Sequence, residues 1–258
     1  MSALSSVRSE RLDALRAEVR AIESAGARKE ADCLPFGIES IDARLVGGGL
    51  ATAALHEITG AAPALSDDAA ATLFVCGIAG RLAGTKGEVL WAFSRRDLFA
   101  PGLALAGLPP GRVIYAECRS DEEVLAVMEE GLRHRGLAAV VGEVGRAQMA
   151  STRRLQLAAE EGGTTALMLK RWKRSGEDPL ALPSAAVTRW RIAPAPSSPL
   201  PVDGIGRPRW QLALVRQRGG EAHEWMMESC DAKGRLALPA QLRDRPPAAD
   251  RREDRRAA

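Results

Sequence analysis

The chain has 258 residues, of which 46% are apolar and 27% are charged, and its charges nearly cancel to a net +3 at pH 7. This composition excludes a disordered chain and can bury a full hydrophobic core, either in one large α/β domain or in two small ones. The small positive charge excludes a protein built to coat polyanions and predicts a soluble, mildly basic one.

Residues 1–30 are predicted to form an amphipathic helix followed by a linker. In residues 9–24, SERLDALRAEVRAIES, apolar side chains recur at spacings of 3, 4 and 3, which places them on one face of a helix with Ser9 as its N-cap. This N-terminal stripe consists of Leu12, Leu15, Val19 and Ile22. Its apolar side chains must be buried against another surface, and the candidates are the chain's own domain and another protein.

The chain shows neither export nor membrane signals. Its opening, MSALSSVRSE, lacks the basic-then-apolar order of a signal peptide, and no apolar run approaches the roughly 20 residues that cross a bilayer. The cysteines Cys33, Cys76, Cys118 and Cys230 lack the paired spacing of zinc or dithiol sites. We therefore expect a cytoplasmic protein with core thiols, no metal and no membrane contact.

A long α/β alternation follows the linker. A Gly-rich turn at residues 47–49 leads into an apolar strand near Ala54–Ile58, then a loop, then an apolar helix whose face includes Leu73, Phe74, Ile78 and Leu82. Residues 87–93, GEVLWAF, form a short strand. Ser120 and Glu123 make a capping box that begins the next helix. Strands at 137–141 and 164–169 flank a helix at 147–161, so the fold class is α/β with a mostly parallel, doubly wound sheet.

The C-terminal part is β-rich. Seven of the 15 prolines lie between Pro179 and Pro208 and punctuate strand-like runs at 186–193, 209–215 and 223–229. These runs are expected to extend the same sheet in antiparallel fashion, so that residues 31–240 form one core. The charged, low-complexity residues 241–258 are expected to be a disordered tail.

The loop after the first core strand has the layout of a phosphate-binding loop without its chemistry. In the pattern G-x-x-x-x-G-K-[ST], Gly frees the backbone N–H groups, Lys contacts the phosphates and the hydroxyl residue binds Mg²⁺. Counting from Gly60, those three places hold Leu65, Ser66 and Asp67. Asp67 and its neighbour Asp68 would instead repel phosphates. The sequence thus predicts the remains of a nucleotide site, no cofactor, and Ser66 or Asp67 as an ordinary helix N-cap.

At this point the order of motifs resembles a known family. LPFGIESIDARLVGGGLATAALHEITG resembles the opening of the RecA-like core. Together with GEVLWAFSRRDLF, RVIYAECRSDEEVLAVMEEGLRHRGLAAVVGEV, TRWRIAPAPSSP and PRWQLALVRQRGGEAHEWMMESCD, it is similar to the ImuA family of bacterial damage-inducible mutagenesis cassettes, over roughly residues 30–240.

The resemblance implies a partner role in SOS-induced translesion synthesis. The expected partners are ImuB, a Y-family polymerase relative without catalytic residues, and, indirectly, an error-prone C-family polymerase; RecA is a further candidate. Because RecA-type proteins dock an N-terminal helix on a neighbour, the N-terminal stripe is the leading partner contact.

The resemblance also allows the recombinase ATPase site to be checked. Where a RecA-type enzyme has its catalytic acid, this chain has Ser94, Arg95 and Arg96. Where the Mg²⁺-supporting Asp should end a strand, it has Gly142 followed by Glu143, which we interpret as a solvated strand-end carboxylate. Hydrolysis would lack its Lys, its metal hydroxyl and its base, so we expect no enzyme activity.

DNA contact is a further expectation from the resemblance. The first of two RecA DNA loops is missing, since VGEVGRAQMA runs straight from strand to helix, and the second corresponds to residues 170–186. Four cations around one Trp there could hold a single strand weakly, the alternative being a solvated strand end. They are Lys170, Arg171, Trp172, Lys173 and Arg174.

Two other functions stay open on the sequence alone. One is a SulA-like division inhibitor, a shorter RecA-related protein that binds the division GTPase. The other is a RecA-type DNA-dependent ATPase with an irregular loop. Of the remaining signals, His56 is interpreted as a core or strand residue, and the five Trp residues as core packing with a partner interface as the alternative.

Overall fold

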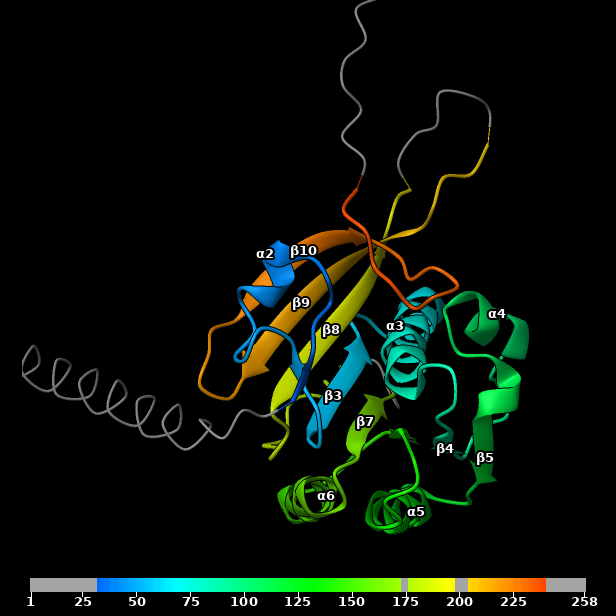
Figure 1. Ribbon diagram of the computed structural model, residues 1–258, viewed down its shortest axis with the longest axis vertical. Helices are drawn as coiled ribbons and strands as arrows, with labels where there is room; N and C mark the ends of the chain where they lie inside the picture. Colours follow the sequence, from blue (N-terminus) through cyan, green and yellow to red (C-terminus); the bar gives the residue numbers. More distant parts are fainter. Residues whose placement is uncertain (1–31, 173–175, 198–203, 240–258) are drawn as a thin grey trace, which may run out of the picture.

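One eight-stranded sheet organises the molecule (Figure 1). The computed structural model describes residues 32–172, 176–197 and 204–239. The N-terminal stripe, Lys173, Arg174 and the tail at 241–258 lie outside the described residues. The strand order is β10-β9-β8-β3-β7-β6-β4-β5, and a small β1–β2 pair stands apart from it. The predicted α/β class with a mostly parallel sheet is confirmed.

Neighbouring strands run parallel from β8 to β5. β9 is antiparallel to β8, and β10 is antiparallel to β9. The predicted antiparallel extension therefore starts one strand later than expected, because β8 joins β3 in parallel. The strands are β3 (Leu55–Gly60), β4 (Val89–Phe93), β5 (Val113–Glu117), β6 (Ala139–Val144), β7 (Thr165–Lys170), β8 (Thr188–Ala195), β9 (Arg209–Gln217) and β10 (His223–Glu228), with β1 at Cys33–Leu34 and β2 at Leu50–Ala51.

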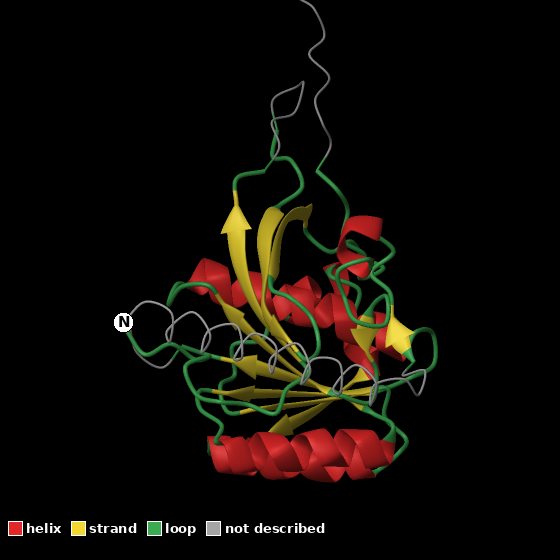
Figure 2. Cartoon of the chain, turned by 90° about the vertical axis from the view of Figure 1, so that its left-hand side faces the viewer, coloured by secondary structure: helices red, strands yellow, loops and turns green. Residues whose placement is uncertain are grey.

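Helices cover both faces of the parallel part (Figures 1 and 2). α3 (Leu65–Ala83) packs on one face, and α5 (Asp121–Arg133) and α6 (Met149–Gly162) pack on the other. The face of α3 also carries the short helices α2 (Glu39–Asp42) and α4 (Ala100–Leu105), and the turn η1 (Pro110–Arg112) leads into β5. No helix among the described residues is long and apolar enough to cross a membrane.

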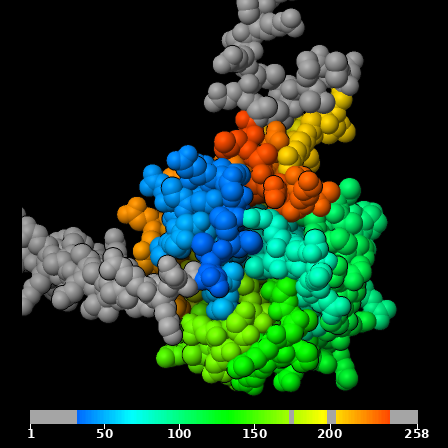
Figure 3. Space-filling view, viewed as in Figure 1, coloured from blue at the N-terminus to red at the C-terminus, as the bar shows by residue number. Residues whose placement is uncertain are grey.

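α3 is apolar almost all round because protein covers it on more than one side. The sheet lies beneath it, and the segment after β10 lies across it: a Cβ added to Gly77 would come 2.4 Å from Cys230 Sγ. In Figure 3 this C-terminal segment, in orange and red, meets the blue N-terminal part of the core on the same face. The predicted helix is confirmed, and its Phe74 and Ile78 are buried.

Aromatic side chains fill the core between α3 and the C-terminal strands. Trp190 lies 5.7 Å from Phe74 and 6.0 Å from Trp225, measured between ring centroids. Trp91, Trp190, Trp210 and Trp225 are all buried, so core packing is confirmed for these four of the five Trp residues.

His56 is buried in β3, as predicted. Its Nδ1 lies 2.7 Å from Thr188 Oγ1 and its Nε2 lies 2.8 Å from the Ala51 carbonyl oxygen. Burial lowers the pKa of His56 to about 4, against the opposing effect of the Ala51 hydrogen bond. His56 is therefore a neutral structural residue at neutral pH.

Candidate functional site: a groove at the carboxyl end of the sheet

Two backbone N–H groups of the loop that resembles a phosphate cradle donate to groups within the protein. β3 ends at Gly60 and α3 begins at Leu65. The Ala61 N–H donates to the Ile192 carbonyl of β8 at 2.9 Å, and the Ala62 N–H donates to Asp67 Oδ1 at 3.1 Å. In a phosphate-binding loop such N–H groups point at the ligand. Here a strand and a carboxylate occupy them.

The predicted side-chain cap of α3 is wrong. Its N-cap is Ala64, which makes no side-chain hydrogen bond, because the helix begins two residues earlier than an N-cap at Ser66 requires. Asp67 therefore lies inside the first turn. From there its carboxylate reaches back to the Ala62 N–H and accepts from the Ser66 hydroxyl at 3.1 Å, as the acidic residue of a capping box reaches back. Asp67 stabilises the loop from within the helix.

A buried ion-pair network stands beside this loop. The Trp91 Nε1–H donates to Glu143 Oε1 at 2.8 Å, and the Arg171 Nε–H donates to Glu143 Oε2 at 2.9 Å. Arg171 also donates from Nη1 to the Asp68 carbonyl oxygen at 3.1 Å, and this nitrogen lies 3.8 Å from Asp68 Oδ1. Burial raises the pKa of the Asp68 carboxyl, partly offset by Arg171.

The interpretation of Glu143 as a solvated strand-end carboxylate is wrong. β6 continues to Val144, so Glu143 lies within the strand, and it is only 4% exposed. Its side chain faces Trp91 on the side of the sheet that α3 covers. Both oxygens accept from protein donors. Within the described ranges, no cluster of three or more His, Cys, Asp or Glu side chains could hold a metal ion.

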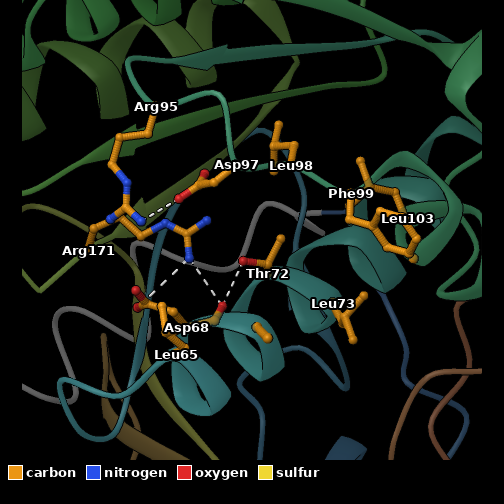
Figure 4. A pocket seen from close by; sticks show the side chains of 12 residues that line it. Leu65, Asp68, Thr72, Leu73, Arg95, Asp97, Leu98, Phe99, Leu103 and Arg171 are labelled. Atoms are coloured by element: carbon orange, nitrogen blue, oxygen red, sulfur yellow. Dashed lines mark hydrogen bonds and ion pairs between the residues drawn. The ribbon is translucent and has the colours of Figure 1, made fainter.

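Two adjoining hollows form the carboxyl-end groove. The first has a volume of about 280 Å³ and lies between the start of α3 and the β4–α4 connection (Figure 4). The second, about 260 Å³, lies over the ends of β4 and β6. Both are bordered by Arg95 and Arg171, so we treat them as one groove. Carboxyl ends of parallel strands are where α/β proteins commonly bind ligands.

The groove has an apolar floor and a charged rim. Leu73, Leu98 and Leu103 line the floor, while Leu65 and Phe99 are 83% and 70% exposed at its mouth. Four carboxylates and two guanidinium groups line the groove, a formal sum of −2, and among them Glu143 and Arg171 are buried. These are Asp68, Asp97, Asp121 and Glu143 against Arg95 and Arg171. This charge disfavours a polyphosphate, and the apolar floor suits a side chain of another protein.

The residues at the expected catalytic-acid position lie on the groove and its border. Ser94 and Arg95 line the second hollow. Arg95 forms an ion pair with Asp97, and Arg96 makes two hydrogen bonds to Glu117 of β5, at 2.7 and 2.6 Å. The geometry therefore places guanidinium groups, already paired, at the point where a recombinase carries its acid.

The cations considered for DNA binding divide into buried and undescribed ones. Lys170 is 1% exposed, and its Nζ lies 3.7 Å from Glu57 Oε1; burial lowers the pKa of this amine. Arg171 is 9% exposed in the network described above. Neither side chain is presented to a DNA strand. Trp172 is half-buried and donates from Nε1 to the Gly60 carbonyl at 2.8 Å.

The connection from β6 to α6 is short, as predicted from the missing first DNA loop. β6 ends at Val144 and α6 begins at Met149. In between, Asp121 Oδ2 accepts from the backbone N–H groups of Gly145 and Arg146, at 3.1 and 3.0 Å. This fixes the turn against the start of α5. Sequence reasoning missed Leu98, Phe99 and α4, although Pro101 in the first turn of α4 is a helix-start signal.

Comparison with known proteins identifies two curated relatives of the chain. No family model matches the chain. Two curated proteins, each named Protein ImuA and from two strains of Caulobacter vibrioides (NA1000 / CB15N, and ATCC 19089 / CIP 103742 / CB 15), are 41% identical to it over 214 residues. The match covers 81% of this chain and 88% of each relative.

Proposed function

The chain belongs to the ImuA family, and from this premise we propose that it is a non-catalytic, RecA-like accessory protein of an SOS-induced, error-prone translesion synthesis complex. It acts through contacts with ImuB, the inactive Y-family polymerase relative, and reaches the error-prone C-family polymerase through it. RecA and single-stranded DNA are secondary partners in this proposal. The N-terminal stripe (Leu12, Leu15, Val19 and Ile22) is the leading contact for ImuB.

The observation that supports the non-catalytic part is that two N–H groups of the loop are bonded within the protein, one of them to a carboxylate. The Ala61 and Ala62 N–H groups donate within the protein, and Asp67 stands where a phosphate would need positive charge. A nucleotide would have to displace that carboxylate and then face the carboxyl-end groove, with its formal sum of −2. The chemistry of phosphoryl transfer requires a Lys or metal at this place.

Partner binding is tested by co-purification with ImuB. The double variant Leu15→Asp and Val19→Asp places two charges on the N-terminal stripe and is expected to abolish co-purification, because charged groups cannot be buried unpaired in an interface. Ala14→Asp in the same predicted helix lies off the stripe and is the matched control. Unchanged recovery of ImuB with the double variant contradicts the proposal.

The absence of nucleotide binding is tested separately by thermal unfolding. A ligand at 100 times its dissociation constant stabilises a protein by about 2.7 kcal/mol, which for a chain of this size raises Tm by roughly 5–10 °C. We expect no shift with Mg²⁺ and ATP at millimolar concentration. A reproducible rise in Tm, or release of phosphate, would support the ATPase alternative instead.

A further inference from the structure

The helix layer formed by α5 and α6 stops before the sheet does. α6 packs on β3 and β7, and α5 packs on β4 and β6. The sheet continues through β8, β9 and β10, but among the described residues neither helix extends under β9 or β10 (Figures 1 and 2). α2 lies on the opposite face, where the Ser40 carbonyl accepts from Trp225 Nε1. The face of β9 and β10 on the side of α5 and α6 is therefore not covered by these helices, while the segment before β8 bonds to Arg189 and Arg216.

A recess marks the end of this helix layer. It has a volume of about 340 Å³ and lies between α6 and the end of β9. Met149, Arg153 and Leu157 line it from α6, and Arg216 and Arg218 line it from the end of β9. We call it the α6–β9 recess. Met149 and Leu157 are 48% and 49% exposed, so two large apolar side chains of α6 lie partly in solvent beside the recess.

The uncovered strand face carries further apolar side chains. Leu214 and Met227 point into the core beneath α3. Side chains alternate along a strand, so the neighbouring Val215 and Met226, 41% and 43% exposed, belong to the opposite face. Gln211 and Glu224, hydrogen-bonded to each other at 2.9 Å, share this face with Met226. The apolar side chains that one more helix alongside α6 would cover are therefore chiefly Met149 and Leu157 of the recess.

We propose that residues 9–24 of the same chain dock in the α6–β9 recess, with the N-terminal stripe buried against Leu157 and the uncovered face of β9. A helix of this length spans about 24 Å and α6 about 21 Å, at 1.5 Å per residue. The two can therefore lie side by side over their whole length. The stripe then covers the apolar side chains that α6 and β9 leave exposed.

The start of the described chain lies close to the recess. The Asp32 carbonyl accepts from the Thr52 N–H, and three residues further on the Leu55 N–H donates to Gln156 Oε1 at 2.9 Å. Gln156 itself lines the recess. Residues 25–31 span at most about 24 Å when extended, which is enough to return a helix from Asp32 to α6 and short enough to keep it there.

The C-terminal half of the stripe and the recess are flanked by opposite charges, whereas Arg11 and Arg16 flank the N-terminal half of the stripe. The recess carries Arg153, Arg216 and Arg218 against the single carboxylate Glu160. In a helix over residues 9–24, Glu18 and Glu23 flank the C-terminal half of the stripe, at 100° per residue. That half lies next to the linker and hence next to the arginines. Docking with the C-terminal half over the recess thus pairs apolar with apolar groups and acidic with basic groups.

Docking within the chain has a regulatory consequence that rests on the proposed function. The stripe cannot be buried in the α6–β9 recess and on ImuB at the same time, so the recess competes with the partner. A variant that empties the recess is expected to bind ImuB more tightly. The docking itself is independent of any partner and is tested without one.

Hydrogen exchange on the full-length protein alone, at low micromolar concentration, tests the docking. We expect the amides of residues 12–22 to exchange about tenfold or more slowly in the native chain than in Leu157→Asp, which places a charge in the recess. Arg153→Glu should have a smaller effect of the same sign. Leu105→Asp, at a 71% exposed position on α4, is the matched control and should leave the protection unchanged.

The outcomes separate the two proposals. Equal, fast exchange of residues 12–22 in the native chain and in Leu157→Asp would overturn the docking, even if ImuB still binds. Protection that increases with protein concentration would also overturn it, because a second copy would then be the cover. Slow exchange of the β3 amides in every variant verifies that the substitutions leave the fold intact.

Discussion

Glu143 connects three elements of the carboxyl-end groove, since its two oxygens accept from Trp91 of β4 and from Arg171 after β7. Removing one partner of a buried ion pair leaves the other charge uncompensated, which is more costly than losing an exposed pair. Whether Glu143 is buried or solvated depends on where β6 ends. Three residues of additional strand, 142–144, convert an expected solvated carboxylate into a buried one.

Replacing Glu143 by Gln is therefore expected to destabilise the protein by about 3 kcal/mol, because Arg171 would keep its charge and lose its carboxylate. Denaturant unfolding at pH 7 measures the change. Glu117→Gln breaks the exposed pair with Arg96 and is the matched control, with no measurable change expected. Equal effects of the two substitutions would mean that Arg171 reaches water once Glu143 is neutral.

His56 makes the stability of the fold depend on pH. Its pKa is about 4 in the folded protein and 6.5 ordinarily. His56 therefore becomes protonated below about pH 6.5 in the unfolded chain, but only near pH 4 in the folded protein. The stability from neutral His56 is complete above pH 6.5 and is lost as the pH falls towards 4, by about 3 kcal/mol in total.

The contribution of His56 to the pH dependence of stability is isolated by comparing the native protein with His56→Gln, because the carboxylates titrate in both proteins. Unfolding free energies measured between pH 7 and pH 4 should fall more steeply for the native chain. His134→Gln, on the surface after α5, is the control and should retain the native slope. Parallel slopes for native protein and His56→Gln would contradict a buried neutral imidazole.

At the scale of elements, the junction of β3 and α3 is fixed by close backbone packing. A Cβ on Gly60 would lie 2.9 Å from the Asp67 carbonyl carbon, which belongs to the first turn of α3. Contacts with backbone of this kind cannot be relieved by rotating a side chain. The strand–loop–helix layout thus persists for a packing reason, with Asp67 bonded to the loop in place of a ligand.

Gly60→Ala is accordingly expected to destabilise the protein by about 1–3 kcal/mol. Elsewhere a Gly→Ala substitution commonly stabilises a protein, because it lowers the conformational entropy of the unfolded chain. The matched control is Gly111→Ala in η1, where an added Cβ would meet nothing within 4 Å. It should be neutral or slightly stabilising. Thermal unfolding of the two variants measures the difference, and a neutral Gly60→Ala would show that α3 can shift away from β3.

Elements that follow a strong local pattern were predictable from the sequence, and those that depend on a neighbour were not. The capping box identified α5: Ser120 Oγ accepts from the Glu123 N–H at 3.3 Å, while Glu123 reaches the Arg119 N–H instead of that of Ser120. β5 was missed, because Val113–Glu117 is a short edge strand that pairs only with β4 and is half-exposed on both faces. Its strand character comes from that pairing.

At the scale of the whole molecule, chain order predicted the sheet but not which side chains meet at its edge. The carboxyl-end groove gathers Leu65, Arg95, Phe99 and Arg171 from three parts of the chain. Only the parallel pairing of β4, β6 and β7 places these parts together. The residues Leu65, Ser66 and Asp67 of the loop could be read from the sequence, whereas the apolar floor beside them depends on the packing of α4 against α3.

Partner binding can also be tested at the carboxyl-end groove, whose residues the structure describes. Leu65 and Phe99 are large, apolar and mostly exposed at its mouth, which is typical of residues that anchor a partner. We expect Leu65→Asp with Phe99→Asp to reduce recovery of ImuB by tenfold or more, about 1.4 kcal/mol. Because both side chains are exposed, unfolding should change little.

The matched control is Ile205→Asp, which places a charge on another apolar residue, 94% exposed and outside the groove. Isothermal titration of ImuB into each variant gives the affinities. If the groove variant binds as tightly as native protein while Leu15→Asp with Val19→Asp does not, the N-terminal stripe alone accounts for the contact. Loss of affinity in both would mean that ImuB spans the groove and the stripe together, and that the carboxyl edge of the sheet serves as a protein-binding surface.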